Sequence, residues 1–367
     1  MKNDVLSWAQ GVPTGKLVSK ETLNHPGLVE LVSGMDVYLN TPQAYLRVYE
    51  ALGIDLVNRL PLTNAPQPTT SGAIRSHPSL PYHYTSLGVF DSVVRHTYAG
   101  TSVEEIFRLD MASIDYDELL TPVPHSCSPD DIRTRESALG DVGLYYPMLY
   151  TTLFMWAVEV LGWELFMQAA STHPEQFHQH FLIPCAEKSA EIVSQIARAS
   201  SSPFVFVHDD LASAIGPVFR PRWYDDWIFP HYPQIWKTAK QLGKKIIFVG
   251  DGDLSVFLPK LVDAGVDGLM FETPATPIER VIEHFGGPGM YLIGGISTSI
   301  LRFGTPQDVR NMVIELNKHS RECPGFAIAS GGGLHGDLPM ENLQAYFDAR
   351  AEINATPQNW KDYWRNL

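Results

Sequence analysis

Ionisable residues follow several apolar runs in the second half of the sequence, and their types suit proton transfer or metal binding. The residues at these positions are His208, Asp209, Asp210, Asp251, Asp253 and Glu272. Imidazole and carboxyl groups exchange protons near neutral pH, and they also bind divalent metals. Several carboxylates in one pocket repel each other unless they share protons or a cation. If these residues meet, we expect either raised pKa values or a metal held by oxygen and nitrogen ligands.

Each residue taken alone also has a structural explanation. Asp209 or Asp210 could cap the turn that follows, and Asp251 with Gly252 forms an ordinary strand-ending turn. The recurrence of such residues favours a site over coincidence. The predicted catalytic residues are His208, Asp209, Asp251 and Glu272.

Further candidates lie in a glycine-rich loop, GGGLHGD, and in the aromatic segment 219–236. Consecutive glycines permit positive φ or close approach of the backbone to a ligand, and a flexible lid is the alternative. Arg220 and Arg222 could bind an anionic group, or they could pair with Asp225 or Asp226. The predicted substrate-binding residues are Asp210, Arg220, Arg222, Asp253, Gly294, Gly332, Gly333 and His335. If a metal is bound, the expected ligands are Asp251, Glu272 and His335.

The elements that position these residues alternate between short apolar runs and longer amphipathic segments. The runs are 204–208, 245–251, 268–272, 290–296 and 326–330. Such alternation predicts parallel strands joined by crossover helices. The runs are continuously apolar because both faces of such a sheet are covered. In a (β/α)8 TIM barrel the carboxyl ends of all strands face one mouth. We therefore predict this α/β fold, with the candidate residues at the mouth.

The first 200 residues are harder to interpret. Helices are predicted at 43–52, 150–170 and 174–199, with a strand within 54–60, and three barrel strands must lie in this part. The Pro-, Ser- and Thr-rich stretch 61–81 predicts an irregular loop, and its length suggests either a cover over an active site or a disordered segment more than a domain linker. We expect one domain over residues 1–367, in which 1–60 is mainly a helical extension.

Composition excludes several classes of partner. The net charge of −14 comes from 27 Lys and Arg against 41 Asp and Glu, without a concentrated basic patch, so nucleic acid is not expected. No run of about 18 apolar residues occurs, so we expect no membrane span. Cys127, Cys185 and Cys323 are far apart and form no thiolate motif, which favours a reducing, cytoplasmic location.

Four blocks of sequence resemble the uroporphyrinogen decarboxylase superfamily, and together they cover about residues 140–350. They are HDDLASAIGPVFRPRWYDDWIFPHY, KKIIFVGDGDLSVFLPKLVDAGVDGLMFE, YLIGGISTSILRFGTPQDV and GFAIASGGGLHGDLPMENLQAYFDA. This superfamily includes porphyrinogen decarboxylases and cobalamin-dependent methyltransferases that act with corrinoid proteins. The resemblance implies a TIM barrel and one of these activities.

The sequence departs from two branches of that superfamily. Residues 1–60 have no R-x-x-G-R-Y segment, and NRLPLT stands where the decarboxylase has an F-S-D-I type strand end, so decarboxylation of uroporphyrinogen is not expected. The coenzyme M branch carries a zinc motif, H-x-C and a later cysteine, which falls here on Val249, Asp251 and a position near Gly333. Members with a D-G-N type strand end, which demethylate methoxylated or methylated amine-like compounds, are more similar.

The resemblance therefore implies a corrinoid-linked methyltransferase acting on a small methylated compound, with the corrinoid on a partner protein and zinc as a possible metal. In this interpretation, Asp209, Asp251 and Glu272 or their metal polarise the heteroatom, and His208 or His335 relays a proton. Two alternatives stay open. One is a lyase that decarboxylates a smaller acidic substrate, and the other is a non-catalytic protein that binds a tetrapyrrole or a methylated ligand.

Overall fold

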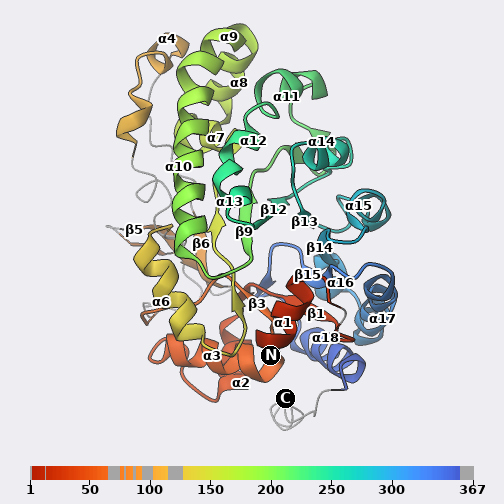
Figure 1. The fold of residues 1–367 in the computed structure, drawn as a ribbon. Coiled ribbons are helices and arrows are strands. Elements are labelled where there is room, and N and C mark those ends of the chain that lie inside the picture. Colours follow the sequence, from red (N-terminus) through yellow and green to blue (C-terminus); the bar gives the residue numbers. More distant parts are fainter. Residues whose placement is uncertain are drawn as a thin grey trace.

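Parallel strands form the centre of the molecule (Figure 1). The computed structural model describes residues 2–12, 14–64, 75–77, 80–85, 88–92, 102–114 and 127–355. The strands of the central sheet are β1 (Val18–Lys20), β3 (Leu56–Val57), β7 (Leu144–Tyr145), β8 (Met148–Leu149), β9 (Phe204–His208), β12 (Lys245–Gly250), β13 (Gly268–Phe271), β14 (Tyr291–Ile296) and β15 (Phe326–Ser330). Their order in space is β7, β3, β1, β15, β14, β13, β12, β9 and β8.

The sheet closes on itself because β7 and β8 are two parts of one strand. β7 pairs with β3, and β8, which follows after Tyr146 and Pro147, pairs with β9 at the other end of the sheet. The Tyr146 amide donates to the Val57 carbonyl at 3.0 Å, and the Pro147 carbonyl accepts from the Phe206 amide at 3.1 Å. Nine described segments thus make eight strands. The (β/α)8 barrel predicted from the sequence is confirmed.

The strands expected in the first 200 residues are β1, β3 and the β7–β8 strand. Residues 1–60 carry α1 (Lys2–Ala9), α2 (Pro26–Ser33) and α3 (Thr41–Leu52), but they also supply β1 and β3, so this segment is more than a helical extension. The predicted helix 150–170 is divided at Gly162 (φ 76°) into α7 (Phe154–Leu161) and α8 (Trp163–Thr172). Most of the predicted loop 61–81 lies outside the described residues.

The remaining helices surround the barrel or extend beyond it (Figure 1). They are α4 (Val103–Ile106), α6 (Pro129–Leu139), α9 (Pro174–Phe177), a π-helical turn (His178–Leu182), α10 (Ile183–Ala199), α11 (Pro221–Trp227), α12 (Tyr232–Ile235), α13 (Lys237–Gln241), α14 (Leu258–Asp263), α15 (Ile278–Phe285), α16 (Thr298–Phe303), α17 (Pro306–Glu322) and α18 (Met340–Ile353), with a 3-10 turn at Met111–Ser113. α17 begins with a capping box, in which Thr305 and Asp308 bond to each other's backbone amides around Pro306. No helix in the described part of the chain is long and apolar enough to cross a membrane.

Short strands outside the barrel complete the described structure. They are β2 (Leu23–Asn24), β4 (Arg75–His77), β5 (Leu80–Thr85), β6 (Gly88–Ser92), β10 (Ala212–Ser213), β11 (Gly216–Pro217) and β16 (Leu334–His335). β16 pairs in parallel with β2, which brings the glycine-rich loop after β15 against the segment that follows β1. β10 and β11 form a hairpin directly after β9.

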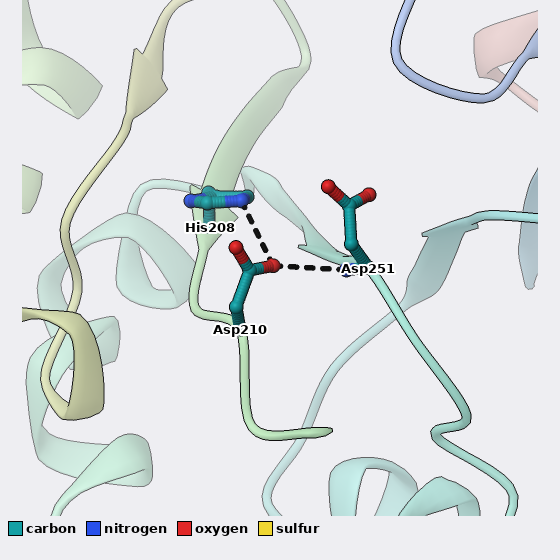
Figure 2. Close-up of side chains that lie close together, drawn as sticks. All are labelled: His208, Asp210 and Asp251. Carbon is teal, nitrogen blue, oxygen red and sulfur yellow. Dashed lines mark hydrogen bonds and ion pairs between the residues drawn. The ribbon is translucent and has the colours of Figure 1, made fainter. Parts of the chain in front are cut away.

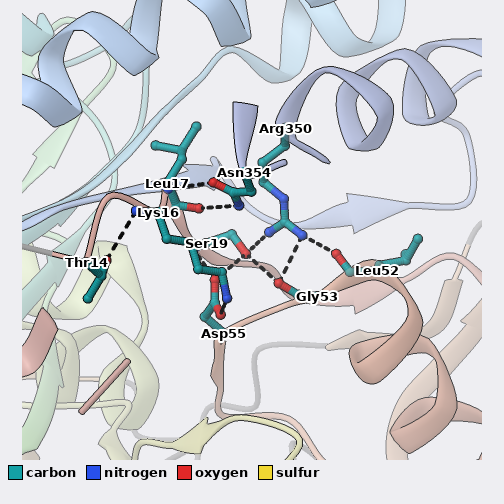
Figure 3. Close-up of polar contacts among 9 residues, drawn as sticks. All are labelled: Thr14, Lys16, Leu17, Ser19, Leu52, Gly53, Asp55, Arg350 and Asn354. Carbon is teal, nitrogen blue, oxygen red and sulfur yellow. Dashed lines mark hydrogen bonds and ion pairs between the residues drawn. The ribbon is translucent and has the colours of Figure 1, made fainter. Parts of the chain in front are cut away.

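Polar contacts attach β1 to the last described helix (Figure 3). The Arg350 guanidinium donates to the Ser19 hydroxyl and to the Leu52 carbonyl. The Asn354 side chain accepts from the Leu17 amide at 2.7 Å and donates to the Leu17 carbonyl at 3.2 Å. These bonds fix a strand of only three residues, whose own ladder is short.

α1 closes the amino-terminal end of the barrel. Trp8 packs against Phe204 and Tyr291, the first residues of β9 and β14, at centroid distances of 5.7 and 5.2 Å. The Tyr291 hydroxyl donates to the Ala9 carbonyl at 2.7 Å. A site in the barrel is therefore reached from the carboxyl ends of the strands.

The packing of α1 against the end of the barrel predicts an effect on stability. Replacing Trp8, whose side chain is 2% exposed, by alanine leaves a cavity under the barrel and should cost roughly 3–5 kcal/mol of unfolding free energy. Trp163→Ala is the control, because Trp163 is 44% exposed, and it should cost less than about half as much. Urea denaturation followed by circular dichroism measures both. Equal losses for the two variants would contradict a sealing role for α1.

Candidate active site

Side chains along the barrel strands alternate between the interior and the surrounding helices, and this rule selects the residues that enter the mouth. In β9 the interior positions are Phe204 and Phe206, so the next inward position is His208. By the same count, Asp251 follows the interior residue Val249 of β12. Two of the predicted catalytic residues therefore enter one mouth from neighbouring strands.

His208, Asp210 and Asp251 lie together there (Figure 2). The His208 Nε2 atom is 3.1 Å from Asp210 Oδ1, and the same oxygen accepts from the backbone amide of Asp251 at 2.9 Å. One ligand atom from each of the three side chains lies within 4.8 Å of those of the other two. His208 is buried, Asp210 is half-buried and Asp251 is exposed, so the cluster can be reached from solvent.

The His208 imidazole is held in one orientation. Its ring stacks on Tyr150 at 4.5 Å, and Nδ1 lies 2.6 Å from the Tyr150 carbonyl oxygen, to which it must donate because a carbonyl only accepts. Burial by itself lowers the pKa of His208, but the carboxylates of Asp210 and Asp251 outweigh it and hold that pKa well above 6.5. Without a metal, His208 is therefore an imidazolium at neutral pH.

The two carboxyl groups of the cluster titrate differently. Asp251 is exposed as a whole residue, but the surrounding mouth partly desolvates its carboxyl group. This desolvation and the charges of Asp210 and Glu272 raise the pKa of Asp251 to about 6, and His208 acts in the opposite direction. Burial would also raise the pKa of Asp210, but the adjacent His208 imidazolium lowers it below its usual range. Asp210 is thus ionised at neutral pH, whereas Asp251 can still exchange a proton.

Glu272 lies at the same mouth but outside the cluster of three. It follows Met270, an inward position of β13, and its charge acts on Asp251. Its side chain passes close to Gly331, where an added Cβ atom would be 2.7 Å from Glu272 Cγ. A glycine at 331 therefore leaves room for this carboxylate.

Asp209 points away from the mouth and caps α7. Its carboxylate accepts from the backbone amides of Leu153, Phe154 and Met155 at 3.0, 2.8 and 2.7 Å, and from the Tyr232 hydroxyl at 2.9 Å. Burial raises its pKa to about 6, and these donors oppose the rise. The predicted catalytic role of Asp209 stays untested, but the structure gives it a positioning contact that joins β9 to α7.

Two other predicted residues, Asp253 and Arg222, make local contacts outside the cluster, and a third, Arg220, is exposed. Asp253 accepts from the Ser255 amide at 3.0 Å and from the Ser255 hydroxyl at 2.5 Å, which caps a turn. Arg222 is 89% exposed and pairs with Asp226 at 3.5 Å. Arg220 is exposed at the start of α11.

The glycines of the predicted binding set allow close backbone packing. Gly294 (φ 156°) would place a Cβ atom 2.7 Å from the Phe271 carbonyl oxygen, and Gly333 (φ 100°) would place one 2.8 Å from the Thr22 carbonyl oxygen. Gly332 (φ 69°) also adopts a conformation that favours glycine. These positions shape the mouth through the backbone.

His335 lies on β16, where its Nε2 atom is 2.9 Å from the Gly332 carbonyl oxygen. Among the described residues, the group of three or more side chains whose ligand atoms converge is His208, Asp210 and Asp251. The predicted metal ligands share only Asp251 with this group.

Sequence reasoning missed two ionisable residues near the cluster. Glu159 is buried on α7, and burial raises its pKa to about 7, with opposing effects from His208 and Asp210. Lys20 is buried at the end of β1. A glutamate within a helix is usually part of a solvent-exposed face, and the three residues of β1 are too few to show an apolar pattern. The sequence therefore indicates a site role for neither residue.

A family model described as "Uroporphyrinogen decarboxylase (URO-D)" matches residues 151–353, more than half of the chain. The chain belongs to the uroporphyrinogen decarboxylase family. This confirms the resemblance seen in the four sequence blocks, and the match includes His208, Asp251 and Glu272. None of the curated proteins matches the chain closely enough to count as a relative.

Solved structures are similar in fold. A methyltransferase from Methanosarcina mazei superposes with a TM-score of 0.63 at 16% identity, covering 96% of this chain and 98% of its own. A dihydropteroate synthase from Xanthomonas albilineans gives 0.34 at 10% identity over 47% and 63% of the two chains. A D-psicose 3-epimerase gives 0.36 at 11% identity over 71% and 88%. The chain therefore shares its fold, over nearly its full length, with the Methanosarcina methyltransferase, whereas the similarity to the other two is weak.

The cluster predicts a pH dependence in the metal-free protein. Because the folded-state pKa of His208 exceeds its ordinary 6.5, the stability that ionised His208 adds is complete below pH 6.5 and is lost as pH rises through the folded-state value. Asp210→Asn should lower the pKa of His208 by about 1 or more. NMR titration of the His208 ring measures this, with Asp253→Asn as control. An unchanged His208 pKa in Asp210→Asn would refute the pairing.

Proposed function

We propose that this chain is a methyltransferase that moves a methyl group between a small O-, N- or S-methyl compound and a corrinoid protein. The observation that carries this proposal is the cluster of His208, Asp210 and Asp251 at the carboxyl ends of β9 and β12, with Asp251 exposed (Figure 2). Membership of the family and the fold shared with a methyltransferase support it. The corrinoid would belong to the partner protein.

The cluster fits a divalent metal such as zinc. Since Nδ1 of His208 donates to the Tyr150 carbonyl, Nε2 is the nitrogen left for a metal, and a second bond of this kind is typical of metal-binding histidines. Asp210 and Asp251 would supply oxygen ligands, whereas all three cysteines are buried and none belongs to the cluster. A metal held there would act as a Lewis acid on the heteroatom that carries or accepts the methyl group.

The chain's own groups supply binding and proton exchange. In the metal-free protein Asp251 is exposed in the mouth and has a pKa of about 6, so its carboxyl group can give a proton to the leaving heteroatom or take one from it. As a ligand of a bound metal it would instead stay ionised. Glu159 is buried and has a pKa of about 7, so it is a second group that can exchange a proton near neutral pH, and the charges of His208 and Asp210 act on it. Asp209 holds α7, and therefore Glu159, in place against β9.

Methyl transfer to cob(I)alamin from a panel of O-, N- and S-methyl compounds tests the proposal through the absorbance of the cobalamin. Asp251→Ala should lower the rate about 100-fold or more, because it removes a reacting group. Asp253→Asn should lower it only slightly, because Asp253 caps a turn. Failure of the wild type to transfer a methyl group from any panel member would count against the proposal.

Zinc affinity tests the ligand set separately. His208→Ala should weaken zinc binding at least about tenfold, measured by competition with a chromophoric chelator. His335→Ala is the matched control and should leave the affinity within about twofold, because His335 contacts the Gly332 carbonyl instead. A larger loss in His335→Ala than in His208→Ala would favour the ligand set predicted from the sequence.

A carboxy-lyase acting on a small acidic substrate is the second candidate. The raised pKa of Asp251 favours it, because a protonated carboxyl group could deliver a proton to the product carbon. Release of carbon dioxide without any corrinoid would distinguish this activity from methyl transfer.

A further inference from the structure

A buried lysine ends β1 and faces the barrel mouth. Lys20 is 4% exposed. It is in register with Leu56 of β3 and Ala329 of β15. Both of these residues, and Val18 two positions before Lys20, belong to the buried apolar group inside the barrel. Residues in register on neighbouring parallel strands point to the same side of the sheet. The Lys20 side chain therefore points into the barrel and away from the surrounding helices.

The ammonium group of Lys20 has fewer partners than a buried cation needs. Its Nζ atom donates to the Thr22 hydroxyl at 2.9 Å, and no ion pair involves Lys20 within the described parts of the chain. Lysine is almost never this buried unless a counter-ion accompanies it. Burial and the positive charge of Arg59 lower the pKa of Lys20 to about 8, against the opposing charges of Glu21 and Asp251. The ammonium form therefore still predominates at neutral pH.

The carboxylates nearest to Lys20 are engaged elsewhere. Glu21 points to the opposite side of the strand, where it accepts from the Ser330 amide at 3.1 Å and from the Tyr346 hydroxyl at 2.6 Å. Asp251 attracts Lys20 across the mouth without forming an ion pair, and it belongs to the His208 cluster. Lys20 and Arg59 therefore leave the β1 and β3 side of the mouth positive, facing a negative side at β9, β12 and β13.

We propose that Lys20, with Arg59 adding to the positive potential, binds a carboxylate of the substrate. The substrate would then be a methylated carboxylic acid whose methyl-bearing end faces Asp251. The second half of this statement rests on the proposed function. The carboxylate subsite itself does not, because it depends only on the burial, direction and missing counter-ion of Lys20.

Binding of a matched pair of compounds to the full chain tests the subsite without any corrinoid. By titration calorimetry, 4-methoxybenzoate should bind the wild type at least tenfold more tightly than 4-methoxybenzamide, which has the same shape without the charge. Lys20→Met should remove this preference, and Lys20→Arg should keep most of it. Lys318→Met is the control, because Lys318 is exposed on α17 and pairs with Glu315, and it should bind like the wild type.

Thermal unfolding of ligand-free Lys20→Met checks its fold. Its melting temperature should equal or exceed that of the wild type, because methionine fills the site without a buried charge. If Lys20→Met nevertheless fails to fold, Lys20→Gln replaces it, and the comparison of acid with amide in the wild type stands by itself. Absence of a carboxylate preference in the wild type, or its persistence in Lys20→Met, overturns the proposal.

Methyl transfer to cob(I)alamin, measured in parallel, separates the subsite from the proposed function. A carboxylate preference that depends on Lys20 in a protein without methyl transfer would retain the subsite and reject the function. Equal transfer from the acid and the amide, unaffected by Lys20→Met, would retain the function and reject the subsite.

Discussion

The barrel depends on one strand that pairs on both sides. Residues 144–149 bond to β3 through β7 and to β9 through β8, and Pro147, which has no amide hydrogen, lies where the pairing changes from one neighbour to the other. Without this strand the sheet would have two open edges. Closure directs the carboxyl end of every strand to one mouth, and since α1 fills the other end, the barrel interior can be reached only through that mouth in the described part of the chain.

Side chains at and after the end of β9 alternate between the two sides of the sheet, so neighbouring residues make different contacts. Asp209 points outward and holds the first turn of α7, whereas His208 and Asp210 take part in the cluster on the inner side. The same type of side chain therefore makes structural hydrogen bonds at position 209 and joins the ionisable cluster at position 210. The difference comes from the surroundings, since three backbone amides and the Tyr232 hydroxyl donate to Asp209, whereas Asp210 has the His208 imidazolium and one backbone amide as partners.

The second half of the fold was predictable because its strands are long apolar runs with a turn after each. His208, Asp251 and Glu272 follow such runs, and the structure places all three at the mouth. β1, β3, β7 and β8 have only two or three residues each, which is too short for a pattern to appear. For the same reason Lys20 escaped notice. The sequence also could not separate Asp209 from Asp210, because a continuous apolar strand does not indicate which face is inward.

The backbone at Gly333 bears on how such a site could change in evolution. A thiolate site of the coenzyme M type would need a cysteine near this position, but φ is 100° and a Cβ atom at 333 would lie 2.8 Å from the Thr22 carbonyl oxygen. A side chain there would force β16 away from β2. A cysteine at position 333 would therefore need a different loop conformation as well as a point substitution. Main-chain geometry, and not only the choice of side chain, separates this loop from a thiolate site of that type.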